Sequence, residues 1–417
     1  MKINNEYMRK HYKGPLFNIM ALVIPLSCVL LQYKATFLTY GLLALLFIAV
    51  CIIIERKAFY IDKEFLFIGL LISIQQILSA LFFDFNIISN LNIVITVWLI
   101  IIASSVGLTV KNSDLLYRNF SILGIITTGA IYIQFLLYNI FGKNISSIML
   151  IRQPEEYMRN WLINGTRPSG FFSEPQTHCS FILPLIILAL EKKHYKFAIF
   201  LSLGVILTGS SLGLIMVSFI WISVMFSYSV STNKKIGIVF FILISAFTFF
   251  TLDSFEPARE KIFTVFNDFS TYLDAKITNN YSYSNYLRLI KGWVTYIELP
   301  IIVKIIGVGI TNFPIYLQSY DIIFSWNAIW DVNANMAAYF SSAAGVFIES
   351  GLFVGIAYYV FLFKKFRQAN LVSKKFIILL FFQSFLTQIF FNNIFTFYFL
   401  IYYVFNKEIK SIVKIKI

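Results

Sequence analysis

Long apolar segments recur from one end of this 417-residue chain to the other, and they constrain its fold more than any other feature. Hydrophobic residues make up 59% of the sequence and charged residues only 13%, whereas roughly 25% of an ordinary soluble domain is charged. About 20 apolar residues in a helix cross the hydrocarbon core of a bilayer. The pattern therefore predicts an all-α integral membrane protein, a single polytopic domain over residues 1–417.

Twelve segments are long enough to be predicted as transmembrane helices. Residues 197–230 are consistent with one long helix or with two short helices that meet at Thr208–Ser211. No signal-peptide cleavage pattern follows the basic N-terminal tail, so the first segment is predicted to be retained. The predicted spans lie at about 14–31, 36–54, 65–83, 87–110, 119–140, 176–190, 197–209, 212–230, 236–252, 340–363, 376–390 and 394–405.

Basic residues are distributed unevenly along the chain. With the N-terminus placed inside, 23 of the 34 Lys and Arg residues fall on the inner side of the predicted spans and 11 on the outer side. Every short inner connection is basic, which is the asymmetry that the positive-inside rule describes. The pattern predicts that both termini are cytoplasmic. It also explains the net charge of +14 as an orientation signal, so no nucleic-acid partner is expected.

Two outer loops, at about 141–175 and 253–339, are long, and loops of such length in a compact protein are usually functional or disordered. Their aromatic content favours loops folded against the membrane surface, with an amphipathic interfacial helix over 284–299. Five of the nine arginines fall in these loops, and the guanidinium fork matches phosphate oxygens. They indicate a phosphorylated, membrane-embedded substrate, although binding of ordinary anionic lipid or pairing with nearby acids explains them too. These arginines are Arg152, Arg159, Arg167, Arg259 and Arg288.

Three ionisable residues stand out on or beside the predicted spans. Glu174 precedes Pro175 where the first long loop enters the membrane, which suits either a reactive carboxylate or an acid at a helix N-terminus. His178 follows one turn later and has an ordinary pKa suited to proton transfer. Glu349 is the one acid inside a predicted span, where an ionisable residue is functional by default or else holds helices together. All three cysteines lie in or beside apolar segments, so no disulfide or metal site is expected.

The stretch R-P-S-G-F-F-S-E-P at 167–175, which opens a helix after a long outer loop, resembles the O-antigen polymerases of the Wzy type. That family forms a superfamily with the O-antigen ligases. Further stretches are similar to family motifs in the family's order, namely L-T-G-S-S-L-G (207–213), R-L-I-K-G-W (288–293), I-I-G-V-G-I-T-N-F (305–313) and F-I-E-S-G-L-F-V-G (347–355). Phe340 and Ser341 stand where the ligases and many polymerases carry His-Asn, which argues against a ligase.

The resemblance implies a GT-C-like fold in the bacterial inner membrane, with both long loops and the active site facing the periplasm. It implies a glycosyltransferase of lipopolysaccharide biosynthesis that joins undecaprenyl-pyrophosphate-linked oligosaccharide repeat units. Such an enzyme needs no metal or other cofactor, because cationic side chains stabilise the leaving pyrophosphate. Its expected partners are the lipid-linked oligosaccharide, membrane lipid and a polysaccharide co-polymerase that regulates chain length.

The resemblance and the residue chemistry together assign candidate roles. Arg167, Arg288 and Arg159 are the candidate pyrophosphate ligands. Glu174 is the favoured base for the acceptor hydroxyl, and His178 is the alternative. The residues whose role is either substrate binding or structural are Glu349, Asn335 and Trp293.

Two other functions compete with polymerisation. A lipid-linked oligosaccharide flippase or secondary transporter also suits twelve helices with both ends inside. The two halves show no internal repeat of the kind that many carriers carry, and the large outer loops also oppose a transporter. Within the superfamily, an O-antigen ligase is the second alternative.

Overall fold

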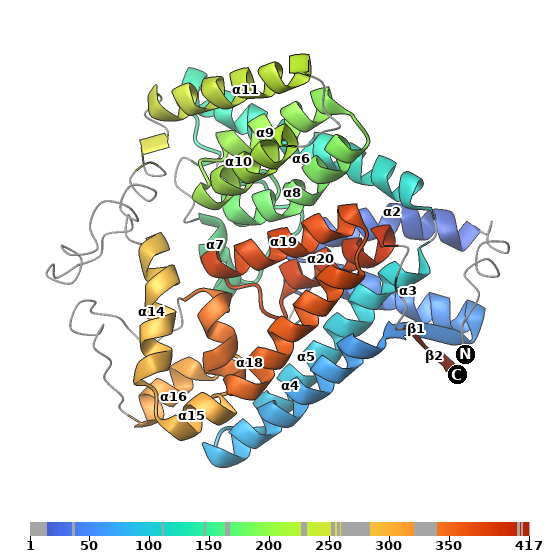
Figure 1. The fold of residues 1–417 in the computed structure, drawn as a ribbon, viewed down its shortest axis with the longest axis vertical. Coiled ribbons are helices and arrows are strands. Elements are labelled where there is room, and N and C mark those ends of the chain that lie inside the picture. Colours follow the sequence, from blue (N-terminus) through green and yellow to red (C-terminus); the bar gives the residue numbers. More distant parts are fainter. Residues whose placement is uncertain are drawn as a thin grey trace, which may run out of the picture.

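Helices form most of the described part of the chain in the computed structural model (Figure 1). Residues 15–35, 38–110, 112–145, 147–162, 167–226, 232–251, 255–256, 259, 284–320, 340–406, 409 and 412–416 are described. The elements are, in chain order, α2 (Pro15–Leu30), α3 (Tyr40–Arg56), β1 (Ala58–Asp62), α4 (Lys63–Phe82), α5 (Ile87–Ser105), the 3₁₀ turn η1 (Val106–Thr109), α6 (Ser113–Phe141), α7 (Glu155–Leu162), α8 (Pro175–Glu191), α9 (Tyr195–Leu207), α10 (Ser211–Met225), α11 (Thr232–Thr251), α14 (Ser284–Glu298), α15 (Ile301–Ile306), α16 (Phe313–Tyr320), α18 (Ser342–Gln368), α19 (Leu371–Leu386), α20 (Asn393–Phe405) and β2 (Ile412–Lys416).

Each segment that the sequence predicts as a span coincides with one of these helices. The stretch 197–230 forms two helices, α9 and α10, which meet at the turn over 208–210. The predicted interfacial helix is α14. Among the described residues, the helices over Lys63–Phe82, Ile87–Thr109, Ser113–Phe141 and Ser342–Gln368 are long and apolar enough to cross a membrane, and five shorter helices are also apolar.

Two helices that are apolar on every side occupy the centre of the structure. Residues 178–190 of α8 and 395–404 of α20 are buried without interruption, as expected for helices that lack a polar face. Surrounding helices instead expose large apolar side chains, such as Phe47 (70% exposed), Phe67 (60%) and Phe353 (70%). Exposed apolar surface of this extent is what a lipid-facing protein presents and a soluble one avoids.

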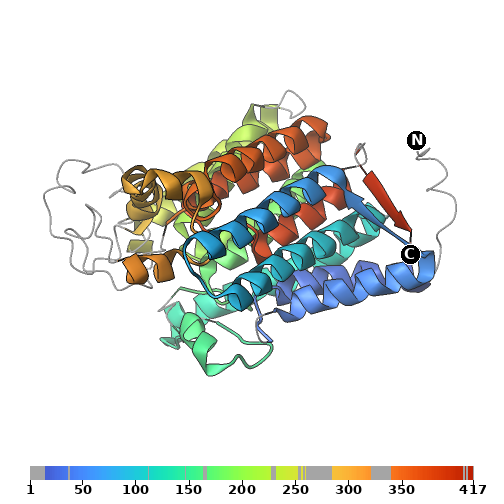
Figure 2. The same ribbon diagram turned by 90° about the horizontal axis from the view of Figure 1, so that it is seen from below.

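The helices form two groups that meet along the central pair. One group contains α6 and α8 to α11, and the other contains α2 to α5 and α18 to α20, with direct packing of α8 against both α19 and α20. Figure 1 shows the first group above the second. In Figure 2 the short helices α14 to α16 and α7 lie at one end of the molecule, and β1 and β2 lie at the other. We call these the loop end and the strand end.

A small β-sheet departs from the all-α prediction. Strands β1 and β2 pair antiparallel, with Ala58 opposite Lys416 and Asp62 opposite Ile412. Strand β1 is buried along its whole length, whereas β2 alternates apolar and basic side chains from Val413 to Lys416. The pairing joins the end of the chain to the α3–α4 connection, so the sheet depends on a contact between distant parts of the sequence.

A buried ion cluster holds the strand end together. Lys365, in the last turn of α18, lies 2.5 Å from Asp62 and 2.6 Å from Glu64, and the side chains of Lys365 and Asp62 are completely buried. The Tyr403 hydroxyl donates to the same Asp62 oxygen at 3.3 Å, and Gln368 donates to Glu64 at 3.0 Å. The cluster therefore ties α18, α4 and α20 to the end of β1.

Replacing Lys365 by Met is predicted to destabilise the protein strongly, by about 3–5 kcal/mol, because it leaves the buried Asp62 without its partner. The matched control is Lys375→Met, since Lys375 pairs with Glu191 at a site where both side chains are one-third or more exposed, and such pairs contribute about 0–1 kcal/mol. Thermal unfolding in nanodiscs measures both variants. Equal melting temperatures for the two would show that the buried cluster adds nothing.

Candidate functional site

The segment 167–175 is held in place at the loop end by the connection between α2 and α3. Gln32 donates from Nε2 to the Phe171 carbonyl at 2.9 Å and accepts from the Ser173 amide at 2.8 Å. The Tyr33 hydroxyl donates to the same Phe171 carbonyl at 2.6 Å. Both carbonyl and amide groups of the segment are thus fixed by side chains from a distant part of the chain.

Tyr33 and α6 fix the segment from two further sides. Tyr33 is fully buried, its ring lies 4.9 Å from that of Trp161, and its hydroxyl accepts from the Leu150 amide at 3.2 Å. Burial raises the pKa of Tyr33 to about 12, so the hydroxyl keeps its proton for donation. From α6, Gln134 accepts from the Gly170 amide at 2.8 Å. The segment is consequently a preorganised loop.

Arg167 begins this segment and lies against the α9–α10 turn. The aliphatic part of its half-buried side chain lies near Gly209. Burial lowers the pKa of Arg167, and attraction to the Glu174 carboxylate opposes that shift. A guanidinium keeps its charge even so. Arg167 and Glu174, at the two ends of one pinned loop, therefore interact across it.

Glu174 is the N-cap residue of α8, but its carboxylate does not cap the helix. Its backbone is extended and its side chain makes no capping hydrogen bond. The side chain is exposed, and Pro175 follows at the first helical position, where its missing N–H costs nothing. The carboxylate is therefore not used to satisfy the end of the helix.

His178 lies one turn deeper in α8 and does not share the exposure of Glu174. It is completely buried, and its ring meets that of Phe172 edge-on at a centroid distance of 5.4 Å. Neither ring nitrogen has a hydrogen-bond partner among the described residues. Glu174 and His178 thus lie in different environments, although they are only one helical turn apart.

A break in α18 organises the other half of the site. Gly351 has φ 75° and ψ 175°, which is not helical, and the helix continues on both sides of it. The break frees two carbonyl groups from the helical ladder. Those of Ile348 and Glu349 accept hydrogen bonds from the amides of Val308 and Gly309, at 3.0 and 2.7 Å. The amides of the I-I-G-V-G stretch therefore bond the carbonyls that the break in the E-S-G motif frees. Two motifs 40 residues apart in sequence thus form one unit.

Glycine is required where these two segments cross. A Cβ at Gly307 would lie 2.3 Å from the Gly351 nitrogen, and a Cβ at Gly351 would lie 2.3 Å from the Ile305 carbonyl oxygen. Both residues also have positive φ values, 80° and 75°, which disfavour any side chain. The sequence motifs thus encode a close approach of two backbones.

Polar side chains from α4 and α5 support this crossing, and sequence reasoning missed them. Gln75 donates to the carbonyls of Ile306 and Glu349 at 3.0 and 2.9 Å. Gln76 accepts from the Ile310 amide at 2.8 Å and donates to Asn90 at 2.5 Å. The signal available in the sequence is the presence of buried amide side chains within otherwise apolar helices, since such groups need partners.

A cavity of about 240 Å³ opens beside the crossing, and the Glu349 carboxylate lines it. Glu349 Oε1 accepts from the Thr311 amide at 3.3 Å. The lining comes from residues 305–313, which we call the Gly-rich segment, from the start of α18 and from the α19–α20 connection. The lining residues are Ile310, Thr311, Phe340, Ser341, Ser342, Gly345, Glu349, Gln388, Phe390, Phe391 and Asn392. The acid inside the predicted span therefore faces a space large enough for a ligand.

Helix α14 packs along the first turns of α18 and against α19. The Trp293 ring lies 5.8 Å from that of Phe347. Lys291 is buried on the same helix, and burial lowers its pKa to about 7. Arg288 belongs to α14, one turn before Lys291, and only its backbone is described.

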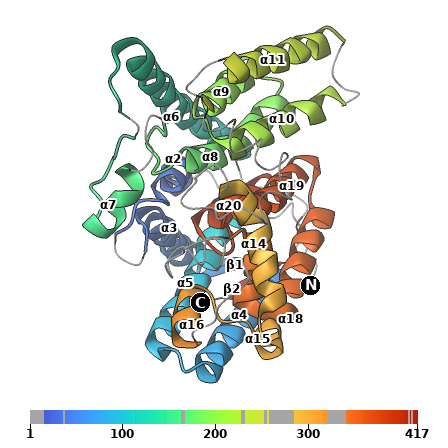
Figure 3. The same ribbon diagram turned by 90° about the vertical axis from the view of Figure 1, so that its left-hand side faces the viewer.

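The structure describes one of the two remaining predicted site residues in part and the other not at all. Arg159 belongs to α7, and only its backbone is described. Asn335 lies outside the described residues. Figure 3 shows α7 and α14 toward the viewer on either side of the loop end.

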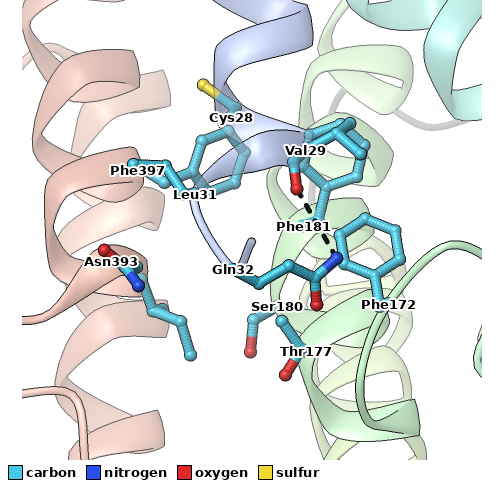
Figure 4. Close-up of a pocket in the computed structure, with 11 residues that line it drawn as sticks. Cys28, Val29, Leu31, Gln32, Phe172, Thr177, Ser180, Phe181, Asn393 and Phe397 are labelled. Carbon is cyan, nitrogen blue, oxygen red and sulfur yellow. Dashed lines mark hydrogen bonds between the residues drawn. The ribbon is translucent and has the colours of Figure 1, made fainter. Parts of the chain in front are cut away.

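A narrow crevice lies between α2, α8 and α20. In Figure 4, Thr177 and Ser180 from α8, Gln32 from the α2–α3 connection and Asn393 from α20 surround it. Its volume of about 30 Å³ is enough for a water molecule. Asn393 lines the crevice, and its neighbour Asn392 lines the larger cavity. The two spaces are thus lined by neighbouring residues at the start of α20.

Comparison with protein-family models finds no model that matches this chain, and comparison with curated proteins finds no matching sequence. The geometry at the loop end is therefore the basis for a functional conclusion. Within the described residues, no three His, Cys, Asp or Glu side chains lie close enough together to hold a metal ion. The chemistry available there comes from the arginine, the two carboxylates and the amide and hydroxyl groups around them.

Gly351→Ala is predicted to lower stability by several kcal/mol, because the new Cβ would clash with the Ile305 carbonyl in a backbone region that costs about 1–3 kcal/mol by itself. The matched control is Gly129→Ala in α6, where a Cβ would meet nothing within 4 Å. Thermal unfolding and hydrogen exchange over 305–313 measure the effect. Normal melting and undiminished protection of Val308 and Gly309 in Gly351→Ala would contradict this account of the crossing.

Proposed function

We propose that this protein is a glycosyltransferase that polymerises undecaprenyl-pyrophosphate-linked oligosaccharide repeat units into O-antigen-type polysaccharide. The observation that carries the proposal is a loop pinned by distant side chains, with Arg167 at one end and the uncapped Glu174 carboxylate at the other. The guanidinium of Arg167 would bind a leaving diphosphate. The carboxylate of Glu174, which makes no capping bond, would accept the proton of the acceptor hydroxyl. The stretch R-P-S-G-F-F-S-E-P, which carries both residues, resembles the O-antigen polymerases, and this resemblance points to the same chemistry.

The proposed reaction transfers the growing glycan from its lipid carrier. The acceptor hydroxyl oxygen attacks the anomeric carbon of the donor, the bond from that carbon to the phosphate oxygen breaks, and a new glycosidic bond forms. The hydroxyl proton passes to the Glu174 carboxylate, and undecaprenyl pyrophosphate leaves with the electron pair. Arg167 stabilises the negative charge that develops on the departing oxygen, and such preorganised electrostatic stabilisation is commonly the largest single contribution to catalysis.

The proposal includes a topology. We infer that the twelve helices corresponding to the predicted spans all cross the bacterial inner membrane in a GT-C-like arrangement, with both termini cytoplasmic. The strand end would then be cytoplasmic and the loop end periplasmic. The concentration of Lys and Arg in the short connections of the strand end supports this orientation. A lipid carrier would bring its pyrophosphate to the level of Arg167 and α14.

Arg167→Ala is predicted to reduce polymerisation by roughly 10²–10³-fold, the loss expected for a donor that acts mainly on transition-state charge. Arg167→Lys should recover only part of the activity, because it supplies charge without the planar fork. Arg288→Ala is expected to behave like Arg167→Ala. The readout is the O-antigen ladder of a deletion strain carrying each variant at equal protein level. Arg118→Ala at the strand end is the control, and wild-type ladders from both loop-end alanine variants would remove the arginines from the mechanism.

Glu174→Gln keeps shape and hydrogen bonding but removes basicity, so it is predicted to stop polymerisation while lipid-linked substrate still binds. His178→Gln should be milder, because His178 is buried away from the exposed end of α8. Initial rates with purified variants measure both. A normal Glu174→Gln enzyme together with an inactive His178→Gln enzyme would reverse the assignment of the base.

A further inference from the structure

The cavity beside Glu349 has the walls of a binding site and not of a packing defect. Three aromatic side chains contribute to it, and Phe340, Phe390 and Phe391 are each less than one-tenth exposed. Glu349 reaches it from the second turn of α18. A small set of placed polar groups within aromatic walls is the usual composition of a small-molecule site.

One hydroxyl in the wall has no partner in the described chain. Ser341 is the N-cap residue of α18, yet its side chain makes no capping bond, and its buried Oγ is unpartnered among the described residues. Its neighbour Ser342 differs, because its Oγ accepts from the amides of Ile389 and Phe390 at 2.5 and 3.1 Å. A buried hydroxyl without a partner costs about 1–3 kcal/mol. A ligand hydroxyl in the cavity would remove that cost.

The backbone around the cavity is strained at two positions. Thr311 has φ 65° and Phe391 has φ 44°, and both residues line the cavity. Positive φ is a true outlier for a β-branched residue such as threonine. Strain of this kind collects at ligand sites, where the surrounding structure holds it in place. Here the Thr311 conformation directs its amide to Glu349.

The charge of the lining selects the class of ligand. Glu349 is acidic, and none of the described lining residues is basic, so the cavity does not suit a phosphate. A carboxylate offers several acceptor positions for hydroxyl groups, and among the described residues the bond from the Thr311 amide at 3.3 Å leaves most of those on Glu349 open. Carboxylate, hydroxyl and aromatic faces together suit an uncharged sugar ring.

We propose that this cavity is the acceptor-sugar subsite, which binds the terminal pyranose of the incoming lipid-linked repeat unit. Glu349 accepts hydrogen bonds from ring hydroxyls, Ser341 bonds a further hydroxyl, and the phenylalanine rings face the apolar side of the sugar. The inference rests on the proposed function for the identity of the sugar's carrier. It divides the loop end into a diphosphate region at Arg167 and a sugar region at Glu349.

Saturation-transfer NMR on the full chain in nanodiscs tests the subsite with methyl glycosides of glucose, galactose, mannose, rhamnose, N-acetylglucosamine and N-acetylgalactosamine. At least one is expected to receive saturation. Glu349→Gln should weaken its binding by about tenfold and Ser341→Ala by several-fold, as expected for loss of one hydrogen bond. Ser350→Ala is the matched control, since Ser350 bonds the Val346 carbonyl and does not line the cavity.

Three results would overturn the subsite. These are absence of saturation across the panel, unchanged binding in both Glu349→Gln and Ser341→Ala, and preferential binding of methyl glucuronide, whose charge Glu349 should repel. Polymerisation without glycoside binding would reject the subsite and leave the proposed function standing. Glycoside binding lost in Glu349→Gln but retained in Arg167→Ala, in a protein that forms no polymer, would support a sugar site and reject the polymerase.

Discussion

The structure at the loop end depends on one backbone interaction, the capture of the broken helix α18 by the Gly-rich segment. The break at Gly351 leaves the carbonyls of Ile348 and Glu349 without helical partners, and the amides of Val308 and Gly309 supply them. Buried carbonyls inside an apolar helix bundle cannot accept hydrogen bonds from water, so these two bonds are needed to stabilise the break. The break in turn places the Glu349 side chain beside the cavity.

Several other features follow from this crossing. Gln75 and Gln76 bond its carbonyl and amide groups, and this explains why amide side chains are buried in the otherwise apolar α4. The strained Thr311 amide reaches Glu349 because the segment that carries it is anchored one turn away. Elsewhere at the loop end, Gln32 and Tyr33 pin the loop of Arg167 and Glu174 by the same kind of bonds. Distant side chains thus hold both segments in fixed positions, and preorganisation of this kind is what the proposed electrostatic catalysis would require.

The sequence predicts the helices well and the contacts between them poorly. Every predicted span coincides with a helix, because the apolar pattern that predicts a helix lies within that helix's own residues. The β1–β2 sheet escaped prediction, since it pairs residues near 60 with residues near 414. The break in α18 was not predicted for the same reason. The stretch F-I-E-S-G-L-F has the pattern of a continuous helix, and the conformation of Gly351 depends on a segment 40 residues earlier.

Candidate site residues divide along the same line. Arg167 and Glu174 are near in sequence, and their interaction could be anticipated from it. His178 also follows closely, but its burial against Phe172 depends on how α8 packs, so the difference between its environment and that of Glu174 could not be predicted. The partners of Glu349 come from loops more than 30 residues away, which no local pattern reveals.

The most direct test is reconstitution of the purified chain in liposomes with an undecaprenyl-pyrophosphate-linked repeat unit as the single substrate. The account predicts lipid-linked glycans of two, three and more repeats, with one undecaprenyl pyrophosphate released for each new glycosidic bond. The Arg167→Ala protein, equally folded, should give neither product at a comparable rate. Translocation of intact substrate without any new bond, or transfer that occurs only when a lipid A core acceptor is added, would contradict the account.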